Sequence, residues 1–223
     1  MAVEHGNHVQ AERVGKQLHT VYIPLEFFGK DGKWYLDAGL GDIYLKYGWL
    51  AEADHEYSSV LAAVQPGEPH WGKSEARKKS AYGLACTNAL RGSYSAALKW
   101  LEQAPGEYNS GCGNCNEATK TRYYPTQVVW TAASKPFSDA EAELKEIMGG
   151  QFRPMKSELN GDTSEQQRQN AASEAALALG CLFYDSGDRA NAETSCKLIT
   201  SDGSPLSDAG ILARGMLSRM RNE

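Results

Sequence analysis

The sequence predicts an all-α protein, built as a right-handed stack of helical hairpins (an α-solenoid) with a flanking helix at each end. Three observations lead to this fold class. Small residues, large residues and a glycine recur at the same offsets in three stretches, a proline follows each stretch, and apolar residues recur at helical intervals. Such recurrence is expected when a helix–turn–helix unit is repeated and neighbouring units bury one another's apolar faces.

The chain is expected to open with a leading helix over residues 3–22, which Pro24 ends. The first clear repeat covers residues 34–66, with helices over 34–46 and 50–64. Gly48 supplies the permissive backbone of the turn between them, and Pro66 closes the unit.

Two further repeats are clear, over residues 78–105 and 173–205. Gly92 and Gly187 are their predicted turns, and Pro105 and Pro205 follow their last helices. A capping helix is predicted over residues 206–221. Its Arg214, Arg219 and Arg221 are placed on the exposed or C-terminal side, as suits a helix that covers the end of a stack.

A degenerate repeat is predicted over residues 123–156, between the second and last clear units. Placing Ala142 at the small position of its second helix puts the turn at Phe137. Pro125 and Pro136 fit the first helix of this unit poorly.

The aligned small residues indicate where the helices of each hairpin touch most closely. A larger side chain at any of them is expected to overpack the contact by about 1–3 kcal/mol. They are Gly41, Ala85 and Gly180 in the first helices and Ala53, Ala97 and Ala192 in the second helices.

This pattern resembles the tetratricopeptide repeat, whose units carry Leu-Gly and an aromatic in the first helix and Ala in the second. The intervals between turns exceed that family's repeat of about 34 residues, so longer loops are expected. The resemblance implies a groove that binds an extended peptide or a partner's helix, and hence a scaffold, an adaptor or a subunit of a larger complex. Groove positions are predicted at Tyr35, Asp42, Leu45, Lys79, Tyr82, Cys86, Tyr124, Gln127 and Leu177.

The family's lysine and asparagine clamp for a terminal carboxylate has no counterpart, because Ala38 and Asp42 stand at the matching positions. A largely apolar and aromatic groove favours an internal segment or a partner subunit. The alternative is that several of these aromatic residues merely pack between adjacent helices.

The composition and charge of the chain disfavour several classes of function. The net charge of −5 and a pI near 5.6 disfavour nucleic-acid binding. No apolar run reaches the roughly 20 residues that span a bilayer, and no secretion signal is evident, so a soluble, cytoplasmic protein is expected. The sequence carries no convincing catalytic set, which predicts a protein that is not an enzyme and binds no cofactor.

One rival interpretation is a nucleotide binder, because Gly67–Ser74 satisfies the phosphate-loop pattern Gly-x4-Gly-Lys-Ser around Lys73. That chemistry requires a buried strand before the loop, whereas the preceding residues read as a helix. Pro69 removes one N–H donor, and Trp71 is bulky where the backbone must approach phosphate. An inter-repeat loop is therefore the favoured interpretation.

A second rival is a metal or redox module at Cys112 and Cys115. Two thiols at this spacing can share zinc, close a small disulfide or act as a redox pair. The pair supplies only two of the four usual zinc ligands, so a disulfide or free thiols are favoured over zinc. Cys86, Cys181 and Cys196 fall on repeat positions and are predicted to be buried.

Overall fold

The structure is a computed structural model that describes residues 32–66, 71–104, 113–156, 163–201 and 208–222. Every regular element in these ranges is an α-helix, which confirms the all-α prediction. The leading helix predicted over residues 3–22 lies outside them. In chain order the helices are α3 (Gly32–Lys46), α4 (Leu50–Ala63), α5 (Trp71–Leu90), α6 (Tyr94–Gln103), α7 (Gly113–Ala133), α8 (Phe137–Met148), α9 (Ser164–Asp185), α10 (Arg189–Ser201) and α11 (Asp208–Asn222).

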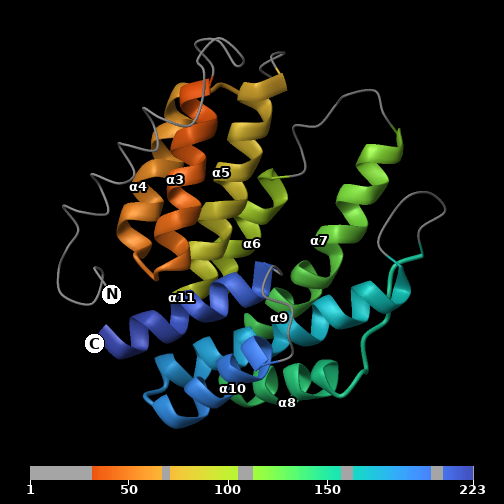
Figure 1. The fold of residues 1–223 in the computed structure, drawn as a ribbon. Coiled ribbons are helices and arrows are strands. Elements are labelled where there is room, and N and C mark those ends of the chain that lie inside the picture. The colour runs from red at the N-terminus through yellow and green to blue at the C-terminus, as the bar shows by residue number, and fades with distance from the viewer. Residues whose placement is uncertain (1–31, 67–70, 105–112, 157–162, 202–207, 223) are drawn as a thin grey trace.

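Consecutive helices pair as hairpins: α3 with α4, α5 with α6, α7 with α8 and α9 with α10 (Figure 1). Gly48, Gly92 and Gly187 lie in the turns of three of these pairs, with φ angles of 77°, 70° and 86°. Glycine adopts this left-handed conformation without the steric cost that other residues carry. The three glycine turns predicted from the sequence are thus confirmed.

Two of the predicted close approaches between helices, at Gly41 and Gly180, are also present. A methyl group added at Gly41 would lie 2.4 Å from the ring of Tyr57, and one added at Gly180 would lie 2.8 Å from Sγ of Cys196. Gly83 of α5 meets the same tyrosine, with an added methyl only 2.2 Å from its ring. The Tyr57 ring is therefore wedged between α3 and α5, and the absence of side chains at two glycines makes room for it.

The third hairpin differs from its predicted register. Phe137 is the first residue of α8 rather than the turn, and Pro136 caps that helix with φ −52° and ψ 146°. α7 runs through Pro125 and ends at Ala133. α8 begins directly after Pro136, because the fixed φ of proline suits the start of a helix. The buried small residue of α8 is accordingly Ala140, whereas Ala142 is exposed.

The hairpins form two groups, α3 to α6 and α7 to α10, and we call the boundary between these groups the seam. α3 packs on α5 in the first group, and α7 packs on α9 in the second. Across the seam α6 contacts α7, but α5 and α7 do not pack along each other, and a few residues of α5 contact α9 instead. A continuous solenoid would pair successive first helices throughout, so the stack is interrupted between the second and third hairpins.

The last helix, α11, lies across this seam rather than over the end of the stack as predicted. It contacts α9 and α10 on one side and α3 and α5 on the other (Figure 1). A methyl group added at Gly215 would lie 2.5 Å from the carbonyl oxygen of Leu45, so the two backbones approach closely. Arg219, expected on the exposed side, instead donates to the carbonyl oxygen of Leu90 at 3.2 Å and lies 5.0 Å from the centre of the Tyr184 ring.

Candidate binding cleft between α3, α5, α7 and α11

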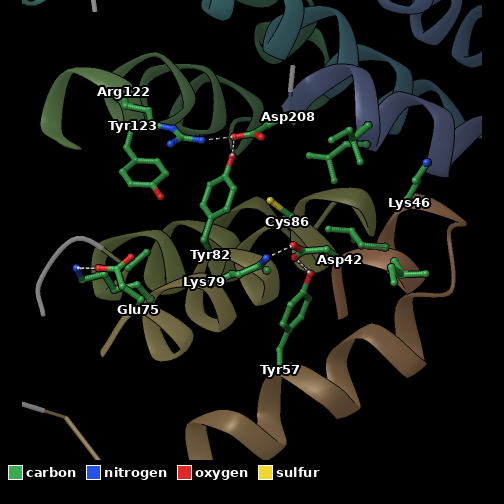
Figure 2. A pocket seen from close by; sticks show the side chains of 17 residues that line it. Asp42, Lys46, Tyr57, Glu75, Lys79, Tyr82, Cys86, Arg122, Tyr123 and Asp208 are labelled. Atoms are coloured by element: carbon green, nitrogen blue, oxygen red, sulfur yellow. Dashed lines mark hydrogen bonds and ion pairs between the residues drawn. The ribbon is translucent and has the colours of Figure 1, made fainter. Parts of the chain in front are cut away.

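A cleft of about 820 Å³ opens where α5 and α7 separate. Its walls come from α3, α5, α7 and α11, with Tyr57 of α4 and Ala104 at the end of α6 also contributing (Figure 2). The lining is mixed: apolar side chains such as Ile43 and Leu212 alternate with carboxylates, cations and tyrosines. Its volume falls in the range of about 300–1,000 Å³ that is typical of ligand sites.

Tyr57, Asp42 and Lys79 form the first polar group of the cleft, which we call the Asp42 cluster. The Tyr57 hydroxyl donates to Oδ1 of Asp42 at 2.7 Å, and Nζ of Lys79 lies 2.6 Å from Oδ2. Burial raises the pKa of Asp42, while the Lys79 charge and both hydrogen bonds act to lower it. Both carboxylate oxygens of this cluster are therefore occupied, which fixes the side chain in place.

Tyr82, Asp208 and Arg122 form the second polar group, the Asp208 cluster. The Tyr82 hydroxyl lies 3.4 Å from Oδ2 of Asp208, and an Arg122 nitrogen lies 3.3 Å from the same oxygen. Asp208 is the first residue of α11, while Tyr82 belongs to α5 and Arg122 to α7. This cluster thus joins three helices across the seam through contacts that are longer than those of the Asp42 cluster.

An aromatic surface adjoins the Asp208 cluster. The rings of Tyr82 and Tyr123 have centroids 5.0 Å apart and planes tilted by 48°. The Arg122 guanidinium carbon lies 6.0 Å from the Tyr123 ring centre, at the outer limit of a cation–π contact. Carboxylate and aromatic faces therefore converge on one guanidinium (Figure 2).

Two buried acids lie close to the cleft. Burial, with the nearby Glu174 and Asp208 carboxyls, raises the pKa of the Cys86 thiol well above its usual range. Burial, with Asp208, also raises the pKa of Glu174 to about 8, against hydrogen bonds from Trp130 and Thr126. Both groups are consequently protonated at neutral pH.

The residues predicted to line a groove have different environments. Asp42, Leu45, Lys79, Tyr82 and Cys86 all line the cleft. Their joint placement shows that first helices of adjacent hairpins present these positions to a common space.

The remaining groove positions lie elsewhere. Tyr124 packs on Phe152 with ring centroids 5.8 Å apart, and Gln127 is exposed on α7. Leu177 is only 3% exposed within the core, so it offers no groove surface. Tyr35 belongs to α3, but its side chain is outside the described part of the structure.

Among the lining residues that the sequence reasoning missed are the four that complete the two clusters and the aromatic surface. Tyr57 lies on a second helix and Asp208 on the predicted capping helix, whereas the predicted groove positions all lie on first helices. Arg122 and Tyr123 stand at the start of the degenerate repeat, whose predicted register placed Tyr124 and Gln127 in the groove instead. Aromatic residues beside charged ones were the available signal, but no pattern linked residues so far apart in the chain.

The phosphate-loop pattern lacks its structural context. Helix α4 occupies Leu50–Ala63, where a buried strand would be required, and residues 71–74 already belong to α5. Residues 67–70 are outside the described ranges. Lys73 therefore lies on a helix rather than at the end of a loop that wraps phosphate.

The predicted metal or redox pair falls largely outside the described residues. Cys112 is not described, and Cys115 lies in the first turn of α7 with its side chain undescribed. In the described residues, no three His, Cys, Asp or Glu side chains converge as they would around a metal ion. Cys86, Cys181 and Cys196 are buried free thiols, as predicted.

Comparisons of the chain with protein-family models, with curated proteins and with solved structures found no match. No helix among the described residues has both the length and the apolar character needed to cross a bilayer. The function therefore has to be inferred from the geometry and chemistry of the cleft.

Proposed function

We propose that this chain is a protein-interaction module, acting as an adaptor or as a subunit of a larger complex, and that its cleft binds a segment of a partner protein. The observation that carries the proposal is the cleft itself, which lies where the packing of the described first helices is interrupted between α5 and α7. Helical-hairpin proteins commonly bind extended segments or helices on surfaces formed by successive first helices.

The lining of the cleft supports binding of a polypeptide segment. Ile43 is 37% exposed, and it lines the cleft together with Asp42, so the wall has both apolar and polar surface. An amphipathic segment presents the same combination. Apolar anchors in pockets with a polar surround are the usual source of affinity at such interfaces.

The chemistry of the cleft supports binding over catalysis. Cys86 is the nucleophile of the lining, but burial and neighbouring carboxyls raise its pKa and keep the thiol protonated, whereas thiol catalysis uses the thiolate. The Tyr57 and Tyr82 hydroxyls face carboxylates, and their pKa values are raised by burial and by those carboxylates. These groups act as hydrogen-bond donors that hold the two clusters.

A site-specific photo-crosslinker tests the proposal. We expect a reactive phenylalanine analogue at Ile43, inside the cleft, to capture a defined partner in the native cell. The same analogue at Leu198, which is 53% exposed on α10 and not part of the lining, is the matched control. Ile211→Trp, which adds bulk to the cleft wall, is expected to abolish the Ile43 adduct, while Leu198→Trp leaves it unchanged. Equal labelling from both positions, or an adduct insensitive to Ile211→Trp, would contradict the proposal.

A further inference from the structure

We propose that the partner segment carries an arginine, and that its guanidinium binds Asp208 beside the Tyr82 and Tyr123 rings in place of Arg122. This inference rests on the proposed function and names the chemistry of the segment that the cleft receives. It follows from the geometry of the Asp208 cluster, in which the guanidinium of the chain's own Arg122 lies near a carboxylate and an aromatic ring.

Asp208 is held in place but incompletely used. Its position at the start of α11 fixes the backbone, and the Tyr82 hydroxyl approaches Oδ2 from α5. Arg122 uses that same oxygen, so Oδ1 has no partner in the part of the chain that the structure describes. A guanidinium can bond both oxygens of a carboxylate at once, which makes the bidentate pair stronger than a single contact.

Arg122 holds this position loosely. Its side chain is 61% exposed, its nitrogen is 3.3 Å from the carboxylate, and its guanidinium carbon is 6.0 Å from the Tyr123 ring centre. An exposed ion pair of this kind contributes little to stability, and the displaced guanidinium is readily hydrated. An incoming arginine can therefore replace Arg122 without leaving a buried charge unpaired.

The Asp42 cluster is less suited to exchange. The contact between Lys79 and Asp42 is 2.6 Å, and Tyr57 occupies the other oxygen at 2.7 Å. The Lys79 side chain is also only 32% exposed. The partner's cation is thus expected at Asp208 rather than at Asp42.

Charge balance offers an opposite possibility, an acidic ligand. The lining holds the cations Lys46, Lys78, Lys79 and Arg122 and the carboxylates Asp42, Glu75 and Asp208. Lys78 and Lys79 are neutralised by carboxylates at 2.8 and 2.6 Å. Lys46 projects apart from the Asp208 cluster in Figure 2. No two lining cations are therefore left to converge on one anion, which favours the guanidinium.

Two small probes of opposite charge separate these possibilities. N-acetyl-arginine amide and N-acetyl-glutamate amide are titrated into the full chain at low ionic strength, and amide NMR shifts of Tyr82 and Tyr123 are followed. We expect saturable shifts with the arginine probe and none with the glutamate probe. Preferential binding of the glutamate probe overturns the inference.

Two variants show whether Arg122 competes for the site. We expect Arg122→Ala to raise the affinity for the arginine probe about two- to fivefold, which is the factor that an exposed ion pair contributes. Asp208→Asn is expected to weaken it by about fivefold or more. Lys145→Ala and Glu141→Gln are matched controls, since this ion pair at 2.7 Å has an equally exposed cation and lies outside the cleft. If Arg122→Ala binds the arginine probe more weakly than the wild type does, the inference is overturned. Removal of a side chain that competes for Asp208 should not weaken binding of the probe.

The result is independent of the crosslinking test. An Ile43 adduct without preference for the arginine probe overturns the arginine inference and leaves the proposed function standing. Failure of the Ile43 adduct overturns the proposed function whatever the small probes do.

Discussion

The junction between the first two hairpins and the junction between the second and third are built from different residues. At the first, Gly41 of α3 and Gly83 of α5 face the Tyr57 ring of α4, and the two first helices pack together. At the second, the tyrosines Tyr82 and Tyr123 face each other, and α5 and α7 are not packed along their lengths. Glycines allow close packing around an aromatic ring at one junction, whereas aromatic residues line a cleft at the other.

The largest expected effect is a pH dependence of the free energy of unfolding, which arises in the second group of hairpins. Glu174 of α9 is buried beneath α7 with its pKa raised to about 8, from 4.5 as the reference value. The folded state binds this proton more tightly than the unfolded state does. Stability is therefore expected to fall as the pH rises from about 4.5 and to level off above about 8, by up to about 5 kcal/mol in all.

Glu174→Gln removes this titration while keeping the shape of the side chain. Urea unfolding at pH 6 and pH 8.5 is expected to show a loss of about 2–3 kcal/mol for the wild type and a much smaller loss for the variant. Equal losses for the two proteins would mean that Glu174 is not the group responsible.

Gly83→Ala is expected to have the next largest effect, because it introduces bulk into the closed junction. The added methyl would lie 2.2 Å from the Tyr57 ring, so the free energy of unfolding should fall by about 1–3 kcal/mol. Gly39→Ala, on α3 with nothing within 4 Å of the added methyl, is the control and is expected to be neutral or stabilising. If Gly83→Ala leaves the free energy of unfolding unchanged, the packing around the Tyr57 ring can adjust to an added methyl group.

Tyr57→Phe tests the polar end of the same side chain. It deletes the 2.7 Å hydrogen bond to Asp42 and leaves the ring in place, which is expected to cost about 0.5–1.5 kcal/mol. Tyr47→Phe, on a ring that is 40% exposed, is the comparison and should change stability little. Chemical denaturation of both variants measures the difference.

Asp208→Asn is expected to have the smallest effect on stability. Both of its contacts in the open junction are longer than 3.2 Å, and the Arg122 and Asp208 side chains are 61% and 41% exposed. The expected change in the free energy of unfolding is about 0–1 kcal/mol, measured by thermal or urea unfolding. A large loss of stability would mean that this cluster holds the seam together rather than serving a ligand.

Local patterns made much of the fold predictable. Gly48, Gly92 and Gly187 mark turns because their left-handed backbone conformation is costly for other residues, and Gly41 and Gly180 mark contacts within one hairpin. The third hairpin was misplaced because Pro136 sets its turn, so no glycine fixes the register there. Proline marks the turn of this hairpin, as glycine marks the other three.

The cleft was predictable only in part. Asp42, Lys79 and Tyr82 lie on first helices, whose repeat positions place them on a common face. Asp208 and Arg122 are 86 residues apart, and their meeting depends on where α11 packs. That position depends on contacts between segments far apart in the chain, and the spacing of residues within a repeat does not predict it.

The backbone contact between Gly215 of α11 and Leu45 of α3 has a consequence for how the chain folds. The amino-terminal hairpin is synthesised early, yet one of the surfaces against which it rests emerges from the ribosome only with α11. Contacts between such distant segments slow folding, because a long loop must close before they form. Until α11 emerges, the surfaces of α3 and α5 that it contacts stay uncovered. Exposed apolar surface makes an incompletely folded chain prone to aggregation.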